Sequence, residues 1–117
     1  MSKIEKFEDL ICWQKARILV KEIYTLSRCF KNDFSLMDQI KRASVSVMSN
    51  ISEGFALRTH KEFKKFLYIS HGSLAEVQSI LYVAFDLNYI TTDTFNEFYN
   101  KCNEISKIIS GLIKSLN

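Results

Sequence analysis

The 117-residue chain contains no proline and only three glycines. Proline interrupts helices and glycine weakens them, so their scarcity favours long and unbroken helices. A sheet-rich fold would need turn signals at intervals of about 8–12 residues, and the sequence lacks such a series. Apolar residues make up 47% of the chain and charged residues 25%, which is typical of a folded protein rather than a disordered one. The composition therefore predicts an all-α fold.

Cysteine and histidine are also scarce, and their spacing indicates no metal site. The three cysteines, Cys12, Cys29 and Cys102, form no Cys-x-x-Cys pair and fall near apolar positions, so we expect small buried side chains. The two histidines, His60 and His71, belong to no Glu-x-x-His pair of the kind that a di-metal bundle uses. No phosphate-binding glycine loop is present. We expect no cofactor, no metal, no catalytic residue and no enzyme activity; only a Ser-His-Asp site assembled from distant segments stays open.

Long apolar segments are missing as well. No run approaches the ~20 apolar residues that a membrane span requires. The first ten residues, MSKIEKFEDL, contain no apolar core of the kind that a signal peptide carries. We therefore expect a cytoplasmic protein with no membrane partner.

The charge is small in total but uneven along the chain. The net charge is +3, which by itself does not argue for nucleic acid. Residues 1–65 carry 13 Lys and Arg against 8 Asp and Glu, a net of +5, whereas residues 66–117 carry 3 against 5, a net of −2. One end or face of the molecule is therefore predicted to be basic.

Apolar residues at spacings of three and four predict four helices, at about 9–28, 36–55, 60–87 and 93–116. Ser35 is the expected cap of the second helix, Thr59 opens a capping box with Glu62, and Thr92 or Thr94 is expected to cap the fourth helix. Short turns force neighbouring helices to run antiparallel. The prediction is a single domain over residues 1–117, an antiparallel up-down-up-down four-helix bundle.

The second helix carries two parallel stripes. Its apolar stripe contains Gly54 at the C-terminal end and is flanked by a polar stripe that is rich in Ser and Asn, which are mediocre helix formers. We interpret the polar stripe as an interface with another helix or another copy of the chain, with Glu76 as a candidate partner for Arg42; a binding groove is the alternative. The stripe is Gln39, Arg42, Ser46, Asn50 and Glu53.

A basic cluster marks the start of the third helix. Several of its side chains share one helix face, and Tyr68 follows one turn later. Such a face is suited to phosphates, because Lys and Arg release counterions when they bind them. An ordinary solvated helix face is the alternative. The candidate nucleic-acid-binding residues are Lys41, Arg58, Lys61, Lys64 and Lys65.

Three blocks of the sequence resemble a known family. The first is F-x-D-L-x-x-W-Q-x-A from Phe7 to Ala16, and the second, from Gln39 to Gly54, is close to Q-x-x-R-A-x-x-S-x-P-S-N-I-x-E-G. The third, K-E-F-x-x-F-L-x-x-x-x-G-S-L-x-E, runs from Lys61 to Glu76. These blocks are similar to the bacterial 23S rRNA intervening-sequence proteins, also called S23 ribosomal proteins. Met48 stands where that family usually has proline, so no proline kink is expected there.

The resemblance implies a small four-helix bundle that assembles into a homo-oligomer, typically a ring of five, with a largely unassigned role. A related branch is the accessory variability protein of diversity-generating retroelements, which works with a reverse transcriptase and binds nucleic acid through a basic surface.

Two functional hypotheses follow. The first is a non-enzymatic homo-oligomer that binds nucleic acid, RNA in particular, through its basic first half. The second is a structural or protein-interaction module that touches no nucleic acid. A small-molecule binder or enzyme in the bundle core is a distant third.

Overall fold

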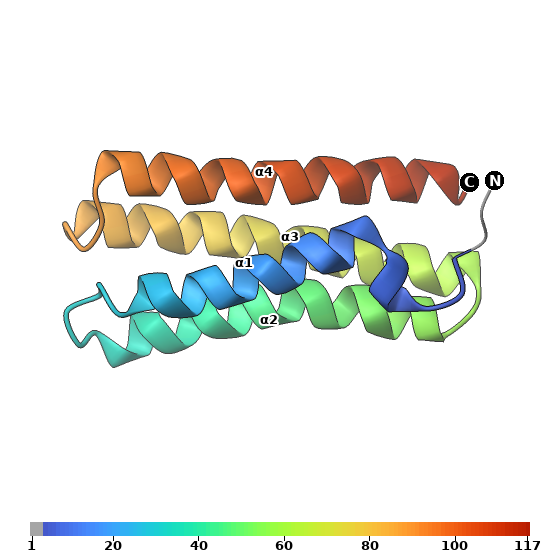
Figure 1. The fold of residues 1–117 in the computed structure, drawn as a ribbon, viewed down its shortest axis with the longest axis horizontal. Coiled ribbons are helices and arrows are strands. Elements are labelled where there is room, and N and C mark those ends of the chain that lie inside the picture. The colour runs from blue at the N-terminus through green and yellow to red at the C-terminus, as the bar shows by residue number, and fades with distance from the viewer. Residues whose placement is uncertain (1–3) are drawn as a thin grey trace.

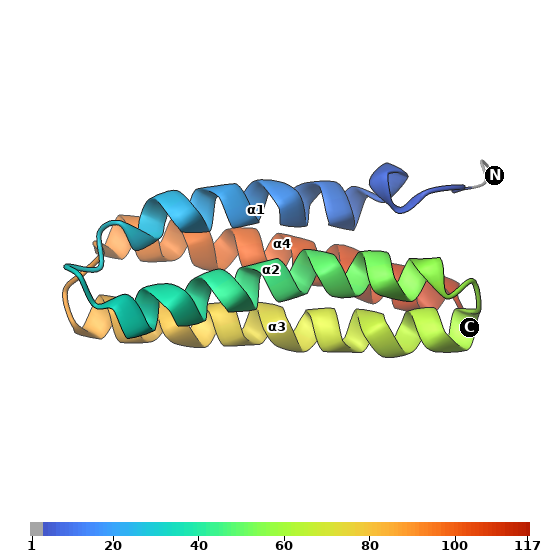
Figure 2. The ribbon, with the colours of Figure 1, turned by 90° about the horizontal axis from the view of Figure 1, so that it is seen from below.

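Four long helices joined by short turns make up the computed structural model of the chain, which describes residues 4–117 (Figure 1). Each helix runs antiparallel to the one before it, and together they form a rod with extents of 45 × 22 × 19 Å (Figure 2). The all-α, up-down bundle that the sequence predicts is thereby confirmed. The elements are the 3-10 turn η1 (Phe7–Asp9) and the helices α1 (Ile11–Ser27), α2 (Phe34–Ala56), α3 (His60–Asp86) and α4 (Thr92–Ser115).

Pairs of neighbouring helices differ in how extensively they pack. The contact between α2 and α3 is the most extensive, and the contact between α1 and α4 is the least. All four helices contribute side chains to one continuous core. The largest fully buried aliphatic side chains are Leu19, Ile23, Ile40, Ile51, Leu67, Leu74, Leu81 and Ile109.

The core face of α1 is narrow. Leu19 and Ile23 are fully buried, whereas Ile11 and Tyr24 are 54% and 44% exposed. Ile18, also 58% exposed, lines a shallow cavity together with side chains of α4. Because α1 and α4 pack least extensively, the flank of α1 that carries Ile18 stays uncovered.

The start of α2 differs from the prediction. Asp33, not Ser35, caps this helix, because its Oδ1 accepts a hydrogen bond from the backbone N–H of Leu36 at 3.1 Å. The other carboxylate oxygen of Asp33 accepts a hydrogen bond from the hydroxyl of Tyr89 at 3.0 Å. This long-range contact fixes the cap at Asp33, and the helix begins at Phe34. It then runs unbroken through Met48 to Ala56, as expected without a proline.

Threonines cap the other two long helices. Thr59 Oγ1 accepts from the backbone N–H of Glu62 at 3.2 Å, so the predicted cap of α3 is confirmed. Thr91 Oγ1 accepts from the N–H of Thr94 at 3.1 Å and caps α4 in place of the predicted Thr92 or Thr94. In both cases the hydroxyl satisfies one of the free N–H groups of a helix start.

The cysteines divide into two groups. Cys12 and Cys102 are buried as predicted, and burial raises the pKa of their thiols to about 11 and about 12 respectively. The prediction for Cys29 was wrong, because α1 ends at Ser27 and Cys29 lies exposed in the turn that follows. Among the described residues, 4–117, no helix is long and apolar enough to cross a membrane.

Candidate nucleic-acid interface

The polar stripe of α2 divides between the α2–α3 seam and the surface. Ser46 Oγ lies 2.8 Å from Ser73 Oγ of α3, and Asn50 Nδ2 donates to the backbone oxygen and the hydroxyl of Ser46 at 2.8 and 2.9 Å. Gln39 and Glu53 are exposed in this chain. Ser46 therefore makes an inter-helix contact, which Asn50 supports from within α2, and whether the whole stripe meets a second copy stays a prediction.

Arg42 does not pair with Glu76 within the chain. Its Nε donates to Asp38 Oδ2, one turn earlier on α2, at 2.8 Å. Both side chains are largely exposed, and Glu76 is exposed on α3. Within the chain Arg42 pairs with Asp38 because an acceptor at i−4 on the same helix is close in every packing arrangement, whereas Glu76 needs α3 at one particular register; pairing with Glu76 of another copy stays a prediction.

Small residues bring α2 and α3 close together. A Cβ added at Gly54 would lie 2.6 Å from Cβ of Phe66, closer than real side chains approach. Ser70 is fully buried and its hydroxyl donates to the backbone oxygen of Val47 at 2.7 Å. Around these residues the seam is therefore filled by close packing.

The basic cluster lies at the end of the bundle where α3 begins. Lys61 and Lys65 are exposed, and Lys64 Nζ donates to Asn117 Oδ1, beyond the end of α4, at 2.6 Å. Arg58 takes a left-handed backbone conformation (φ 65°) in the α2–α3 turn, and its guanidinium carbon lies 5.4 Å from the ring centroid of Phe55. These residues therefore share one end of the molecule.

Lys41 does not belong to this cluster. It lies in the second turn of α2, and 15 residues separate it from the C-terminal end of that helix, a distance of roughly 22 Å at 1.5 Å per residue. Its Nζ lies 5.0 Å from the ring centroid of Tyr24 on α1, so it covers the α1–α2 seam. The prediction grouped Lys41 with the others by its position in the sequence, and the direction of α2 places it far from them.

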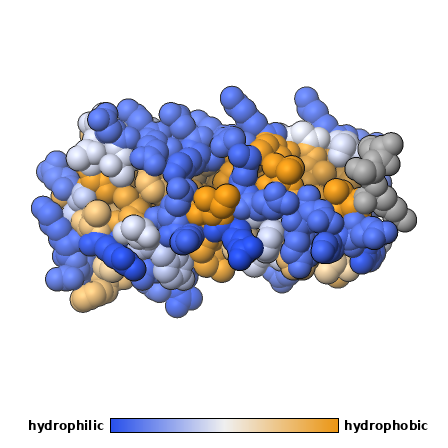
Figure 3. Space-filling model, in the orientation of Figure 1, coloured by the Kyte–Doolittle hydropathy of each residue, from blue (hydrophilic) through white to orange (hydrophobic). Residues whose placement is uncertain are grey.

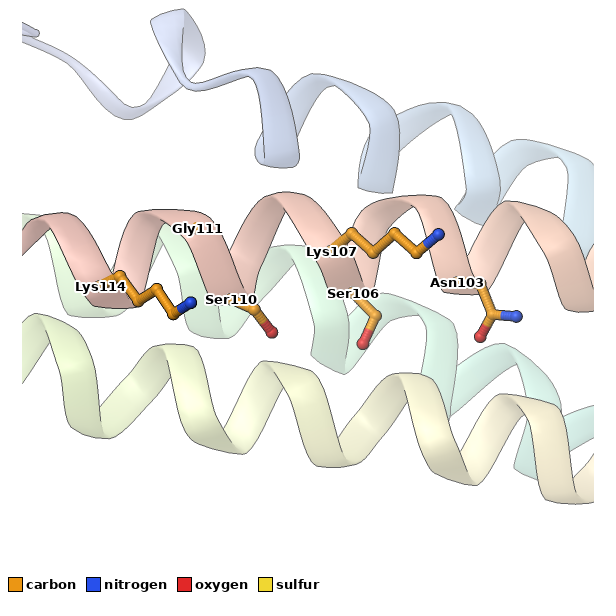
Figure 4. Close-up of a pocket in the computed structure, with 6 residues that line it drawn as sticks. All are labelled: Asn103, Ser106, Lys107, Ser110, Gly111 and Lys114. Atoms are coloured by element: carbon orange, nitrogen blue, oxygen red, sulfur yellow. The ribbon is translucent and has the colours of Figure 1, made fainter.

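Two lysines of α4 join the cluster instead. Because α4 runs antiparallel to α3, its C-terminal half, with Lys107 and Lys114, lies beside the N-terminal half of α3. A groove of about 370 Å³ runs along this part of α4 (Figure 4). Ser106, Ser110 and Lys114 point from α4 toward α3, whereas Lys107 extends along the exposed side of α4. Sequence reasoning missed both lysines because it summed charge over halves of the chain; their seven-residue spacing was the available signal.

The seam between α3 and α4 is bridged by polar side chains. Besides the Lys64–Asn117 bond, Gln78 Nε2 donates to Asn103 Oδ1 at 2.8 Å and to the backbone oxygen of Tyr99 at 3.2 Å. Within residues 4–117, none of the side chains that hydrogen-bond across this seam is a carboxylate. We call the cavity on α4 together with the adjoining α3–α4 seam the α3–α4 groove. Lys107 and Lys114 line the cavity, and with Lys61, Lys64 and Lys65 at the start of α3 they make up the basic half of this surface.

One contact in the groove has the composition of a catalytic pair. His71 Nε2 lies 2.7 Å from Ser106 Oγ, and both side chains are half-buried. A hydroxyl nucleophile needs a base that a third group orients, together with free N–H donors for the oxyanion. Within the described part of the chain, no carboxylate hydrogen-bonds to His71, and both residues lie inside long helices whose amides bond along the helix. The arrangement therefore supports a polar bridge between α3 and α4.

Comparisons with known proteins agree with this architecture. The model of the 23S rRNA-intervening sequence protein family matches residues 8–111. A crystal structure of a protein with unknown function, from the S23 ribosomal protein family of Bacteroides thetaiotaomicron, is similar at 23% identity with a TM-score of 0.81, over 89% of this chain and 99% of the other. No curated protein matches the sequence. Because the family model covers most of its length, the chain belongs to the 23S rRNA-intervening sequence protein family.

Proposed function

We propose that this protein is a non-enzymatic, self-associating bundle that binds nucleic acid, RNA above all, along the basic half of the α3–α4 groove. The observation that carries the proposal is the position of five lysines in the same half of the bundle: Lys107 and Lys114 line the cavity on α4, the other three lie on the first two turns of α3, and neutral side chains make the bonds that bridge the two helices. The family description, 23S rRNA-intervening sequence protein, makes structured RNA the first ligand to test.

The lysines of this groove have fewer carboxylate partners than Lys15 and Lys101 elsewhere on the bundle. Lys15 pairs with Glu104 at 2.9 Å, and Lys101 pairs with both Glu22 and Glu97 at 2.8 and 3.1 Å. Within the described chain, none of the five groove lysines has a carboxylate partner. Lys61 also lies in the first turn of α3, where a cation opposes the helix dipole. A bound phosphate would relieve this repulsion.

The test is a titration of a fluorescent structured RNA and of a DNA duplex at ~50 and ~200 mM salt. Five neutralised phosphates would give a slope of about −3.5 to −4.5 in log affinity against log salt, so affinity should fall about a hundredfold or more over this range. The triple variant Lys61→Glu, Lys107→Glu, Lys114→Glu should lose binding at both salt concentrations.

A matched control uses the opposite end of the bundle. Lys21, Arg28 and Lys31 are exposed on α1 and in the turn after it, and reversing all three changes the net charge by the same amount. This control should keep most of the affinity if the groove is the binding surface. Equal loss in the two triple variants would mean that only net charge matters, and absence of binding at ~50 mM salt would overturn the proposal.

Self-association is supported by the outer face of α2 and α3. Exposed apolar side chains lie on α3 and directly after it, beside the polar stripe of α2; Ile69 and Val83 of α3 are 45% and 42% exposed, and Leu87, which follows the helix, is 48% exposed. Apolar residues among polar ones are typical of surfaces that another protein covers. The expected assembly, a ring of five by family resemblance, pairs this face with a second copy.

Sedimentation measures the assembly directly. The chain has a mass of 13.7 kDa, so a homo-oligomer should sediment at a multiple of that value. Ile69→Glu should lower the mass, and Asn50→Leu should change the mass or the solubility, because both alter the same face. Ile18→Glu, on the diagonally placed α1, is the matched control. A wild-type mass of 13.7 kDa at every concentration would exclude self-association.

The second hypothesis, a protein-interaction module, draws support from α1. Ile11 and Ile18 are more than half exposed and lie seven residues apart on one row of the helix. Figure 3 shows hydrophobic residues breaking the hydrophilic surface along the middle of the face to which α1 and α4 contribute. If the groove binds no nucleic acid, this row is the surface to test against protein partners.

A further inference from the structure

Exposed tyrosines lie on the same row of α3 as Lys61. Lys61, Tyr68, Ala75 and Tyr82 follow one another at seven-residue intervals on α3, and all four are exposed. Residues at this spacing lie nearly in line along a helix. Tyr68 is 62% exposed and Tyr82 is 51% exposed, so both rings present much of their surface to solvent.

The ring of Tyr82 is held in place while it stays exposed. Its centroid lies 4.8 Å from that of Phe95 and 5.9 Å from that of Tyr99, both on α4. Phe85 joins the same cluster at 5.5 Å from Phe95. A ring that its neighbours orient loses little conformational freedom when a flat ligand stacks on it. Tyr82 is therefore a prepared stacking surface at the far end of the groove.

The distance between the tyrosines suits a strand of nucleotides. Tyr68 and Tyr82 are separated by 14 residues, or about 21 Å along the helix. That length corresponds to roughly six nucleotides at the ~3.4 Å spacing of stacked bases. Lys61 and Lys114 lie beyond Tyr68 toward the end of the bundle with the chain termini. Lys107 lies between the levels of the two tyrosines, because its neighbour Ser106 contacts His71. Phosphates would lie on these lysines.

The arrangement favours single strands over duplexes. The faces of bases inside a duplex are covered by their neighbours, whereas a single strand exposes them to aromatic side chains. A basic groove that tracks the backbone, with aromatic rings at intervals, is the usual construction of a single-strand site. Between the tyrosines, the amides of Gln78 and Asn103 lie at the seam, where they can meet base edges.

We propose that the α3–α4 groove binds single-stranded nucleic acid, with its phosphates on the lysines and its bases stacked on Tyr68 and Tyr82. This inference rests on the proposed function and specifies its ligand. It predicts two separable contributions to affinity, one that depends on charge and one that depends on bases.

The experiment compares three ligands of about 12 nucleotides, within the size range of known single-strand sites. They are a fluorescent single-stranded RNA, the same backbone with abasic positions, and a duplex of the same sequence. Wild type should bind the base-bearing strand most tightly. Tyr68→Ala and Tyr82→Ala should each lower that affinity about 5- to 150-fold. Both should bind the abasic strand as wild type does.

Controls separate stacking from folding. Tyr82→Phe keeps the ring and should bind as wild type does. Tyr24→Ala removes an exposed tyrosine of α1 outside the groove and should also bind as wild type does. If Tyr82→Ala fails to fold, the abasic strand and Tyr68→Ala still decide the question.

Different failures have different meanings. Equal affinity for base-bearing and abasic strands, equal affinity for the duplex, or unchanged binding by Tyr68→Ala would overturn the single-strand proposal while leaving lysine-dependent binding intact. A change in the native mass of Tyr68→Ala with no change in binding would also overturn it, since the tyrosines would then contact another copy. No binding of any ligand would overturn the proposed function itself.

Discussion

The α2–α3 seam and the α3–α4 seam share one helix but are built from different side chains. Between α2 and α3, Gly54 and Ser70 allow close contact, and the extensive packing is apolar apart from buried serine hydroxyls. Between α3 and α4, long polar side chains bridge the helices, and the packing is less extensive. Close packing fixes geometry, whereas a looser polar seam leaves charges and aromatic rings available to a ligand. We therefore assign stability mainly to the α2–α3 seam and ligand binding to the α3–α4 seam.

Gly54→Ala is expected to have the largest effect on stability. The added methyl group would meet Phe66 Cβ at 2.6 Å and Phe63 Cδ1 at 3.3 Å, so α2 and α3 must move apart. Overpacking of this kind lowers the free energy of unfolding by about 1–3 kcal/mol. Urea denaturation followed by circular dichroism measures the loss.

Gly111→Ala is the matched control on α4. A Cβ at Gly111 meets nothing within 4 Å, and the position is exposed within a helix. Alanine should therefore raise the free energy of unfolding by about 0.5–1 kcal/mol. If both variants shift the free energy of unfolding in the same direction, the close approach at Gly54 is not what stabilises the α2–α3 seam.

Ser70→Ala tests the buried hydroxyl of the same seam. The variant removes the bond to the backbone oxygen of Val47 and should lower stability by about 1 kcal/mol. Ser79→Ala, on the exposed side of α3, should stay within about 0.5 kcal/mol of wild type. Thermal or urea unfolding of the pair would contradict the prediction if the two variants were equally stable.

His71→Ala tests the polar seam. It removes the contact with Ser106, which is half-buried, so the loss of stability should be about 0.5–1 kcal/mol. The same variant examines the catalytic alternative, because a working Ser-His pair would also lose hydrolysis of an activated ester. Ester hydrolysis by wild type that disappears in His71→Ala would contradict the proposed non-enzymatic role.

The smallest effect on stability is expected for Lys107→Glu with Lys114→Glu. Both side chains are exposed, and neither forms an ion pair within residues 4–117. The free energy of unfolding should therefore stay within about 0.5 kcal/mol of wild type. RNA affinity should nevertheless fall. If the free energy of unfolding fell as well, these lysines would also contribute to stability, and the two seams would not differ in role.

The sequence by itself determined the helices and their number. The absence of proline and the 3.6-residue period of apolar positions are local properties, and they place α3 and α4 within a few residues of their observed bounds. The Thr59 cap was predictable for the same reason, since donor and acceptor lie three residues apart. The resemblance in three sequence blocks also named the family correctly.

Only the tertiary structure decided which distant residues meet. The carboxylate of Asp33, which caps α2 locally, also accepts a hydrogen bond from Tyr89, 56 residues away. Lys41 leaves the basic cluster and Lys107 and Lys114 enter it because antiparallel packing reverses the direction of alternate helices. The local period fixes the face of each helix on which a side chain lies, but the neighbour of that face and its register depend on the packing of the whole core.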